Sequence, residues 1–415
     1  MPAEEAPAPR PRRETGVETT SAARPLGLPL LLNALLVSLA AAVGQGFARF
    51  AYALLLPPMR AELGWSYAQA GLANSANAAG YLAGALLVGP AVARWGAPRV
   101  IRLSLLAVSL SLVASGLLPA FAPLMLWRAI SGVGGALIFV AGVAVVLALD
   151  SSHRSELPIG VYYAGPGIGI ALSGALLPLI LGPLGWGWQA AWVALGVLGL
   201  GALLLVEPPL RAAGRVTPPR AVRRERLFVA GDYLRLWPAL TAYGLFGLGY
   251  IGYMTFVVAY LRAIGVAPGL VQGFWVLLGV AAAASGFTWR PVVRRARPPL
   301  ALCAVLAALT LGAALPVLAP AGWSFLVSAV LFGSSFLAVI TVITLEVRAT
   351  LPPARWTAVT GNATAVFAFG QLVGPALTGL IADMRGGLAL GLLGSAVLLG
   401  VAALIALAGL RGGGR

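Results

Sequence analysis

Runs of about 20 or more apolar residues recur along the whole chain, and the charged residues lie almost entirely between these runs. A helix of about 20 apolar residues is long enough to cross the hydrocarbon core of a bilayer. Of the 415 residues, 60% are hydrophobic even before the 53 glycines are counted, a share well above that of water-soluble domains. The pattern predicts an all-α polytopic membrane protein.

Loops that contain charged residues, proline or Gly-Pro divide the chain into twelve predicted transmembrane helices. Their expected ranges are about 29–57, 68–93, 99–118, 124–149, 158–182, 186–206, 236–261, 268–289, 299–318, 322–346, 357–383 and 388–409.

The longest connection, 207–235, is rich in arginine and proline and separates six helices from six. It predicts a basic cytoplasmic linker between an N-terminal six-helix bundle, 28–206, and a C-terminal six-helix bundle, 236–410. Residues 1–27 are rich in Pro, Glu and Arg without an apolar run, which predicts a disordered cytoplasmic tail. Residues 411–415 are expected to form a second, short cytoplasmic tail.

A weak internal repeat supports two related halves. At an offset of about 203 positions, glycines and aromatic residues of the first helix match those of the seventh, and Arg49 falls opposite Gly252. Related halves predict a substrate site between them, near the bilayer midplane. Chance coincidence in a glycine-rich chain is the alternative. The matched sets are Gly44, Gly46, Phe47 and Phe50 with Gly247, Gly249, Tyr250 and Tyr253.

The arginines mark one side of the membrane. The net charge is +16, and the loops of one side hold most of the arginines, whereas the other side has only Arg60, Arg262 and Arg385. Positive loops stay in the cytoplasm, so both termini are predicted to be cytoplasmic, in a bacterial inner membrane. The charge therefore reflects orientation, and nucleic-acid binding is not expected.

Signatures of enzymes are missing from the sequence. The single histidine, His153, lies in a loop, and Cys303 is the single cysteine, so no metal-ligand cluster is expected. The chain has no lysine, which excludes the phosphate-binding loop that ends in Gly-Lys. We expect no enzyme activity, no metal and no cofactor.

Several motifs resemble those of the major facilitator superfamily. The loop "GPAVARWGAPRV" is similar to the superfamily's cytoplasmic signature, although Ala93 stands at its acidic position; "RAISGVGGA" is similar to its fourth-helix motif, and "AGPGIGIALSG" and "GQLVGPALTG" to its Gly-Pro motif. The residues that carry these matches are Gly89, Arg94, Gly96, Arg99, Arg128, Gly132, Gly165, Pro166, Gly169, Gly374 and Pro375.

The stretch from Phe47 to Leu86 resembles the first two helices of the YbfB/YjiJ-type branch of that superfamily. The resemblance implies a twelve-helix carrier with two bundles that works by alternating access. It implies no particular substrate. It also implies that Arg128 supports a proton-linked conformational change, whereas the residues alone leave open that Arg128 locks the bundle by bonding to carbonyls of the first helix.

Arg49 lies inside the first predicted span, where a charged side chain is costly and needs a partner. Its planar guanidinium group can donate two parallel hydrogen bonds to a carboxylate or phosphate in a central cavity. The alternative is a structural role, in which Arg49 bonds to carbonyls freed by a break at Gly44 and Gly46 or pairs with an acid. No Asp or Glu lies within the spans of the first half, so a positive cavity that favours anions is expected.

Other polar and aromatic residues lie on helices that line carrier cavities by family resemblance. Together with Arg49 they predict a pocket for a small organic anion with an apolar or aromatic part, although each one alone could instead join helices. They are Tyr52, Asn74, Asn77, Tyr162, Tyr163, Tyr250, Tyr253, Trp275, Asn362 and Gln371.

The sequence favours a secondary carrier for a small organic, preferentially anionic solute. Its expected partners are that solute and the lipid bilayer, with protons as the candidate coupling ion and the monomer as the functional unit. A proton-coupled exporter of hydrophobic drugs is one alternative, suggested by the Gly-Pro motif. A non-transporting sensor or scaffold, whose basic linker binds a partner or anionic lipid, is another.

Overall fold

The computed structural model describes residues 28–150, 157–215, 230–384 and 387–412, and these residues form helices joined by short connections. The first half comprises α1 Leu28–Ala41, the π-helix η1 Ala42–Phe50, α2 Tyr52–Leu63, α3 Tyr67–Trp95, α4 Ala97–Leu117, α5 Phe121–Leu149, α6 Leu157–Tyr163, α7 Gly165–Leu181 and α8 Gly187–Gly214. The second half comprises α9 Ala230–Ala263, α10 Pro268–Ala283, α11 Ser285–Thr288, α12 Arg290–Arg295, α13 Pro298–Leu318, α14 Gly322–Thr350, α15 Pro353–Ala382 and α16 Gly387–Gly412.

The predicted membrane spans are present. Within the described residues, 11 helices are long and apolar enough to cross a bilayer, and there are 12 if the bent pair 268–283 and 285–295 counts as one span. That pair bends by 55°. The prediction of an all-helical polytopic membrane protein is confirmed.

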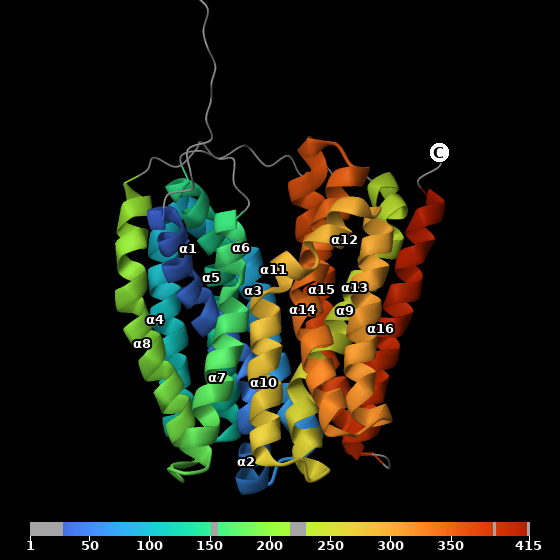
Figure 1. Cartoon of the computed structure of the whole chain (residues 1–415). Helices are drawn as coiled ribbons and strands as arrows, with labels where there is room; N and C mark the ends of the chain where they lie inside the picture. Colours follow the sequence, from blue (N-terminus) through green and yellow to red (C-terminus); the bar gives the residue numbers. More distant parts are fainter. Residues whose placement is uncertain (1–27, 151–156, 216–229, 385–386, 413–415) are drawn as a thin grey trace, which may run out of the picture.

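The helices form two groups that stand side by side, α1–α8 and α9–α16 (Figure 1). We call the end where α1 begins and α16 ends the termini end, and the end where α2 gives way to α3 the opposite end. α8 continues to Gly214 and α9 begins at Ala230, so both ends of the predicted linker 207–235 are helical. The central part of that linker, 216–229, and the predicted tail 1–27 lie outside the described residues, as does most of the tail 411–415.

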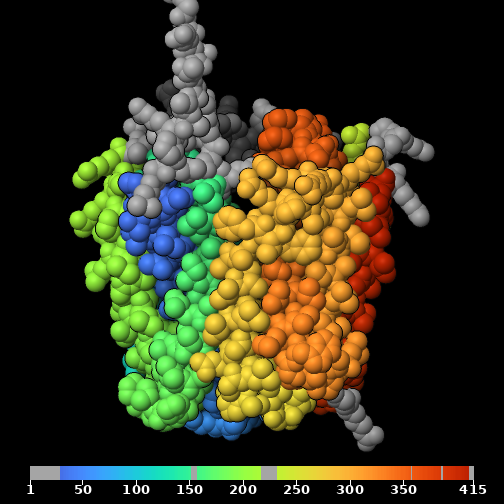
Figure 2. All heavy atoms as spheres, in the orientation of Figure 1, coloured from blue at the N-terminus to red at the C-terminus, as the bar shows by residue number. Residues whose placement is uncertain are grey.

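The most extensive contacts between the halves are those of α3 with α15, α7 with α10, and α2 with α9. Figure 2 shows the α7–α10 seam as adjoining green and yellow surfaces. Glycine allows close approach at each long seam, because a Cβ at Gly71 would collide with the carbonyl of Pro375, and one at Gly167 with the backbone of Ala283. Gly379 of α15 packs in the same way against the backbone of Tyr67, at the opposite end of the molecule.

The first span is interrupted where the sequence predicted a break. Residues 42–50 form a π-helix, in which the backbone N–H of Ala51 bonds to the carbonyl of Gly46 at 2.8 Å. A Cβ at Gly46 would collide with Gly169, so the interruption packs directly on α7. The span was predicted to end at Pro57, but α2 continues through two prolines and ends at Leu63, followed by Gly64, whose φ of 66° gives a left-handed cap.

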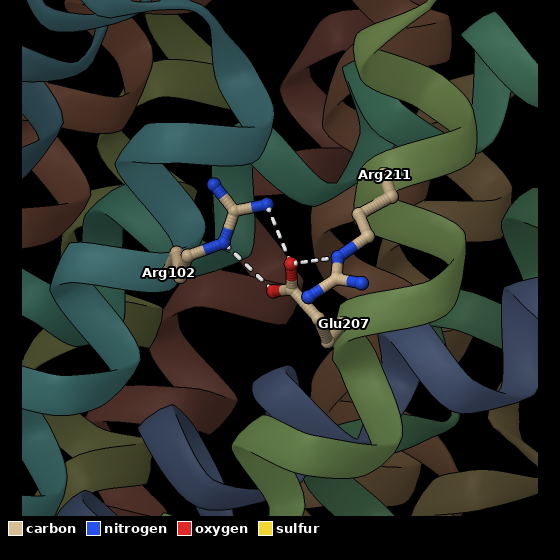
Figure 3. Close-up of polar contacts among 3 residues, drawn as sticks. All are labelled: Arg102, Glu207 and Arg211. Atoms are coloured by element: carbon tan, nitrogen blue, oxygen red, sulfur yellow. Dashed lines mark hydrogen bonds and ion pairs between the residues drawn. The ribbon is translucent and has the colours of Figure 1, made fainter.

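Ion pairs near the termini end link helices of the same half. Glu207 of α8 accepts hydrogen bonds from Arg102 of α4 and from Arg211 one turn further along α8 (Figure 3). In the second half, Arg355 of α15 pairs with Asp232 of α9 at 2.6 Å. These contacts fix helices within each half and leave the halves free of ionic links to each other among the described residues.

Candidate functional site

A small cavity of about 30 Å³ lies between the halves, with room for about two water molecules. Its wall is formed by η1, α3, α5 and α7 of the first half and by α9, α14 and α15 of the second half. The lining residues are Gln45, Arg49, Phe50, Tyr81, Phe139, Pro166, Phe246, Tyr250, Phe336, Leu337, Ile340, Phe367 and Gln371.

Arg49 is the single charged residue in this lining, and it is only 4% exposed. Its Nη2 donates to Oε1 of Gln371 at 2.7 Å, across the boundary between the halves. Gln371 in turn donates through Nε2 to the hydroxyl of Tyr250 at 2.6 Å. The Nε of Arg49 is buried without a hydrogen-bond partner. The predicted residues Arg49, Tyr250 and Gln371 thus come together in one hydrogen-bonded chain.

Aromatic rings cover the guanidinium and much of the cavity wall. The Cζ of Arg49 lies 4.9 Å from the centre of the Tyr81 ring, which is within the range of a cation–π contact. Phe246 stacks on Tyr250 with centres 4.7 Å apart and planes 19° apart. Phe367 lies parallel to Phe246 within 8°. The cavity therefore combines one cation with a set of flat apolar surfaces.

Arg128 has a different environment, although it is also buried. Its Nη1 donates to the carbonyl of Ala48, its Nη2 to Oδ1 of Asn74 at 2.9 Å, and its Nε to the carbonyl of Ala73. Its Cζ lies 4.7 Å from the Tyr52 ring. Each nitrogen of this guanidinium has an acceptor, so Arg128 joins α5 to the first span and to α3. The contacts are those of the bundle-locking alternative.

The two predicted asparagines extend this network and do not line the cavity. Asn74 donates through Nδ2 to Thr255 of α9 at 2.6 Å, which adds a second hydrogen bond between the halves. Asn77 donates to the carbonyl of Arg128 and to Ser131. Both amides are therefore used in helix packing.

The remaining predicted pocket residues also lie outside the lining. Tyr52 donates to the carbonyl of Ala70, and Tyr162 donates to the carbonyl of Ile138. Trp275 donates to the hydroxyl of Ser173, and the hydroxyls of Tyr253 and Ser328 share a hydrogen bond. Tyr163 is 39% exposed, and Asn362 donates to Tyr233 in an exposed contact. The structure therefore brings three of the predicted pocket residues to the cavity and gives the others partners elsewhere.

Sequence reasoning did not single out several lining residues, yet helical spacing could have found three of them. Phe246 and Phe367 lie four positions before the predicted residues Tyr250 and Gln371, and Tyr81 lies four positions after the predicted residue Asn77. Residues four apart share a face of an α-helix. Phe139 and Phe336 carry no such signal, and Gln45 lies in the π-helix, where this spacing does not apply.

Most motif residues within the spans occupy packing positions, whereas Pro166 lines the cavity. A Cβ at Gly132, Gly165, Gly169 or Gly374 would collide with the backbone of a neighbouring helix. The carbonyl of Pro375 contacts Gly71. α6 ends and α7 begins on either side of Ala164, next to the first Gly-Pro motif, whereas α15 is continuous through the second.

The loop motif lies at the termini end. Gly96 ends α3 with a φ of 77°, which favours glycine, and the Cζ of Arg94 lies 6.0 Å from the Trp95 ring. Gly89 is in the last turns of α3, and Arg99 is in the first turn of α4.

The contacts of the matched glycines do not follow the register predicted for the internal repeat. Gly46 packs against α7, the fifth span, and Gly247 packs against α15, the eleventh span, whereas Gly249 packs against α16. Equivalent glycines should meet equivalent spans, and Gly46 and Gly249 do not. Arg49 and Tyr250 both line the cavity, one from the first span and one from the seventh.

Solved structures of transporters share this fold. The crystal structure of nucleoside transporter NupG matches 93% of this chain and 99% of its own chain, with a TM-score of 0.71 and 13% identity. A bacterial homologue of the human lysosomal transporter Spinster, in an inward-facing and occupied conformation, matches 92% of this chain and 96% of its own, with a TM-score of 0.70 and 19% identity. At these identities the likeness shows the fold alone.

Sequence relatives are closer. The uncharacterized MFS-type transporter YcaD of Salmonella typhimurium is 29% identical over 273 residues, and the match spans 63% of this chain and 64% of that protein. The same match is found in Salmonella typhi. The model of the family described as "Uncharacterised MFS-type transporter YbfB" matches residues 41–407. The chain therefore belongs to the YbfB family of MFS-type transporters, a family of membrane carriers and not of enzymes.

Proposed function

We propose that this protein is a secondary active transporter, which moves a small organic anion across the bacterial inner membrane by alternating access. Arg49 is the charge anchor of the substrate in this proposal. Its termini are cytoplasmic in this proposal, because the arginine-rich loops lie at the termini end. The proposed functional unit is the monomer, and the proposed coupling ion is the proton.

The observation that carries the proposal is the lack of a counter-charge at Arg49. No Asp or Glu belongs to the cavity lining, and the acceptor on Nη2 is the neutral amide of Gln371. A buried cation in a membrane protein needs compensation, and a charged acceptor provides more of it than a neutral one. A substrate anion between the halves would supply that charge.

The distribution of contacts between the halves supports alternating access. Asp383, at the end of α15, accepts hydrogen bonds from the backbone N–H groups of Tyr67 and Ala68 at 2.8 Å each. The Asn74–Thr255 hydrogen bond lies one to two turns deeper along α3. These contacts close the opposite end, so the proposed access to the cavity in this conformation is from the termini end.

A ligand screen followed by transport tests the proposal. The purified protein is heated with organic anions, cations and neutral solutes, and each stabilising solute is assayed by counterflow in proteoliposomes. Anions should stabilise the protein and exchange across the membrane, and Arg49→Gln should abolish both effects at an unchanged protein level. Arg211→Gln, which removes an exposed arginine of the Glu207 cluster, is the matched control and should transport normally.

Three results would contradict the proposal. Equal transport by Arg49→Gln and the native protein would remove the anchor role. Preferential stabilisation by hydrophobic cations, together with drug resistance in cells without efflux pumps, would favour the exporter instead. Absence of stabilisation by every solute, with capture of a partner through the 207–235 segment, would favour the sensor or scaffold.

A further inference from the structure

The number of free cations at the cavity limits the charge of the substrate. Arg49 is the charged residue of the lining, and the neighbouring Arg128 has an acceptor on each of its three nitrogens. One available guanidinium balances one negative charge. A dianion would bring a second charge into a site where the described residues offer no further free cation, so a monoanion fits best.

On the edge of the Arg49 guanidinium that faces Gln371, only one of the two N–H donors has a hydrogen-bond acceptor. Nε and Nη2 lie on the same edge of the planar group and donate in parallel, a geometry that matches the two oxygens of a carboxylate. Gln371 offers one carbonyl oxygen, bound to Nη2 at 2.7 Å, and the buried Nε has no acceptor. A carboxylate in place of the Gln371 carbonyl would satisfy both donors.

The wall beside this edge consists of aromatic rings in nearly parallel planes. The ring planes of Tyr250 and Phe336 differ by 10°, and those of Phe367 and Phe246 by 8°. Phe367 is also stacked on Tyr243, with ring centres 4.6 Å apart. Parallel faces accept another flat ring by offset stacking. A branched or saturated group would make fewer contacts with these faces.

We propose that the substrate is a planar aromatic monocarboxylate, whose carboxylate displaces the Gln371 carbonyl from Arg49 and whose ring stacks on the faces of Tyr250 and Phe367. This inference rests on the proposed function and names its substrate class. The cavity of about 30 Å³ is too small for such a ring, so binding also requires the Arg49–Gln371 bond between the halves to open. Gln371 is thus a specificity-determining residue that substrate binding releases.

Calorimetric titration of the full-length protein in lipid nanodiscs tests the substrate class with four probes. Benzoate is the aromatic monoanion, cyclohexanecarboxylate lacks the flat ring, benzyl alcohol lacks the charge, and phthalate carries a second charge. Benzoate should bind roughly two- to tenfold tighter than cyclohexanecarboxylate, as expected for one stacked aromatic pair. It should bind at least about tenfold tighter than benzyl alcohol or phthalate.

Gln371→Glu tests the displacement step. The new carboxylate would pair with Arg49 inside the protein, so benzoate affinity should fall at least about tenfold while the fold is kept. Gln69→Glu is the matched control, because it adds the same charge at an exposed capping position where glutamate is equally suitable. Its benzoate affinity should equal that of the native protein.

The outcomes separate this inference from the proposed function. If aliphatic carboxylates bind through Arg49 and benzoate binds no tighter, the aromatic class is wrong and the anion carrier stands. If Gln371→Glu binds benzoate normally, the displacement step is wrong. If no anion binds, or if Arg49→Gln leaves binding unchanged, both this inference and the proposed function fail.

Discussion

Asp383 of α15 accepts the backbone N–H of Tyr67 at 2.8 Å and so caps the first turn of α3 from the other half of the molecule. A carboxylate at a helix N-terminus stabilises the helix by about 1 kcal/mol. Here the stabilisation depends on contact between the halves. It therefore favours the conformation that is closed at the opposite end.

Asp383→Ala should shift the protein toward opening at the opposite end, by roughly fivefold for a loss of about 1 kcal/mol. Thr255, which is 1% exposed behind this contact, provides the measurement. In a Cys303→Ala background, maleimide labelling of Thr255→Cys should accelerate when Asp383 is replaced. Glu62→Ala removes an acid at the same end whose hydrogen bonds to Trp188 and Gln189 stay within one half, and it should not change the rate.

Replacing each of the two buried arginines of the first half with glutamine should change the stability of the protein by different amounts. Arg128→Gln leaves the carbonyl of Ala48 and the amide oxygen of Asn74 short of a donor, which should lower stability by about 2 kcal/mol or more. Arg49→Gln removes a cation without a counter-charge, so stability should stay within about 1 kcal/mol of the native value. Thermal unfolding in detergent measures both. A larger loss for Arg49→Gln than for Arg128→Gln would contradict this assignment of roles.

Gly46→Ala should destabilise the first span. Its Cβ would collide with the backbone of Gly169, and backbone atoms cannot yield as a flexible side chain can. Such overpacking costs about 1–3 kcal/mol. The thermal midpoint should fall, whereas Gly201→Ala on α8, where no atom lies within 4 Å of the new Cβ, should not lower it, because alanine favours a helix more than glycine does. Equal midpoints for the two variants would show that η1 and α7 can separate without cost.

Glu207→Gln should have a small and salt-dependent effect. The glutamate pairs with Arg102 at 2.8 Å and Arg211 at 2.7 Å, but the Arg211 side chain is 70% exposed. Exposed ion pairs contribute about 0–1 kcal/mol, and salt screens them. The thermal midpoint should fall slightly at low ionic strength, and the difference from the native protein should disappear near 1 M salt. A large drop in the thermal midpoint that persists at high salt would instead indicate that Glu207 holds α8 in place through contacts other than these ion pairs.

The fold could be predicted from the sequence because its main cause, the burial of apolar spans in lipid, is local in the chain. The candidate site could be predicted only in part. Arg49 can be recognised in the sequence because a charged residue inside a membrane span is energetically costly. Phe246 and Phe367 are ordinary residues for a membrane helix, and only the folded structure shows that their rings stack on each other. Asn74 has the polarity of a ligand-binding residue, but its amide is used by Arg128 and Thr255, a pairing that requires three helices to be in place.

The repeat register failed for a similar reason. The π-helix 42–50 contains wider turns than an α-helix, so sequence offsets across it no longer preserve the helix face. A glycine pattern can predict that a helix is interrupted there. It cannot predict the pitch of the interruption, which depends on the packing of Gly46 against Gly169.

The neutral acceptor on Arg49 has an electrical consequence for the proposed transport cycle. The site with Gln371 bound to Arg49 carries one uncompensated positive charge, whereas the same site with a monoanion is neutral. The membrane potential acts on charges that move across the bilayer, with about 2.3 kcal/mol per elementary charge per 100 mV. When no proton is bound, the voltage-sensitive step of this carrier would therefore be the reorientation of the empty protein, and the reorientation of the loaded protein would be insensitive to the potential.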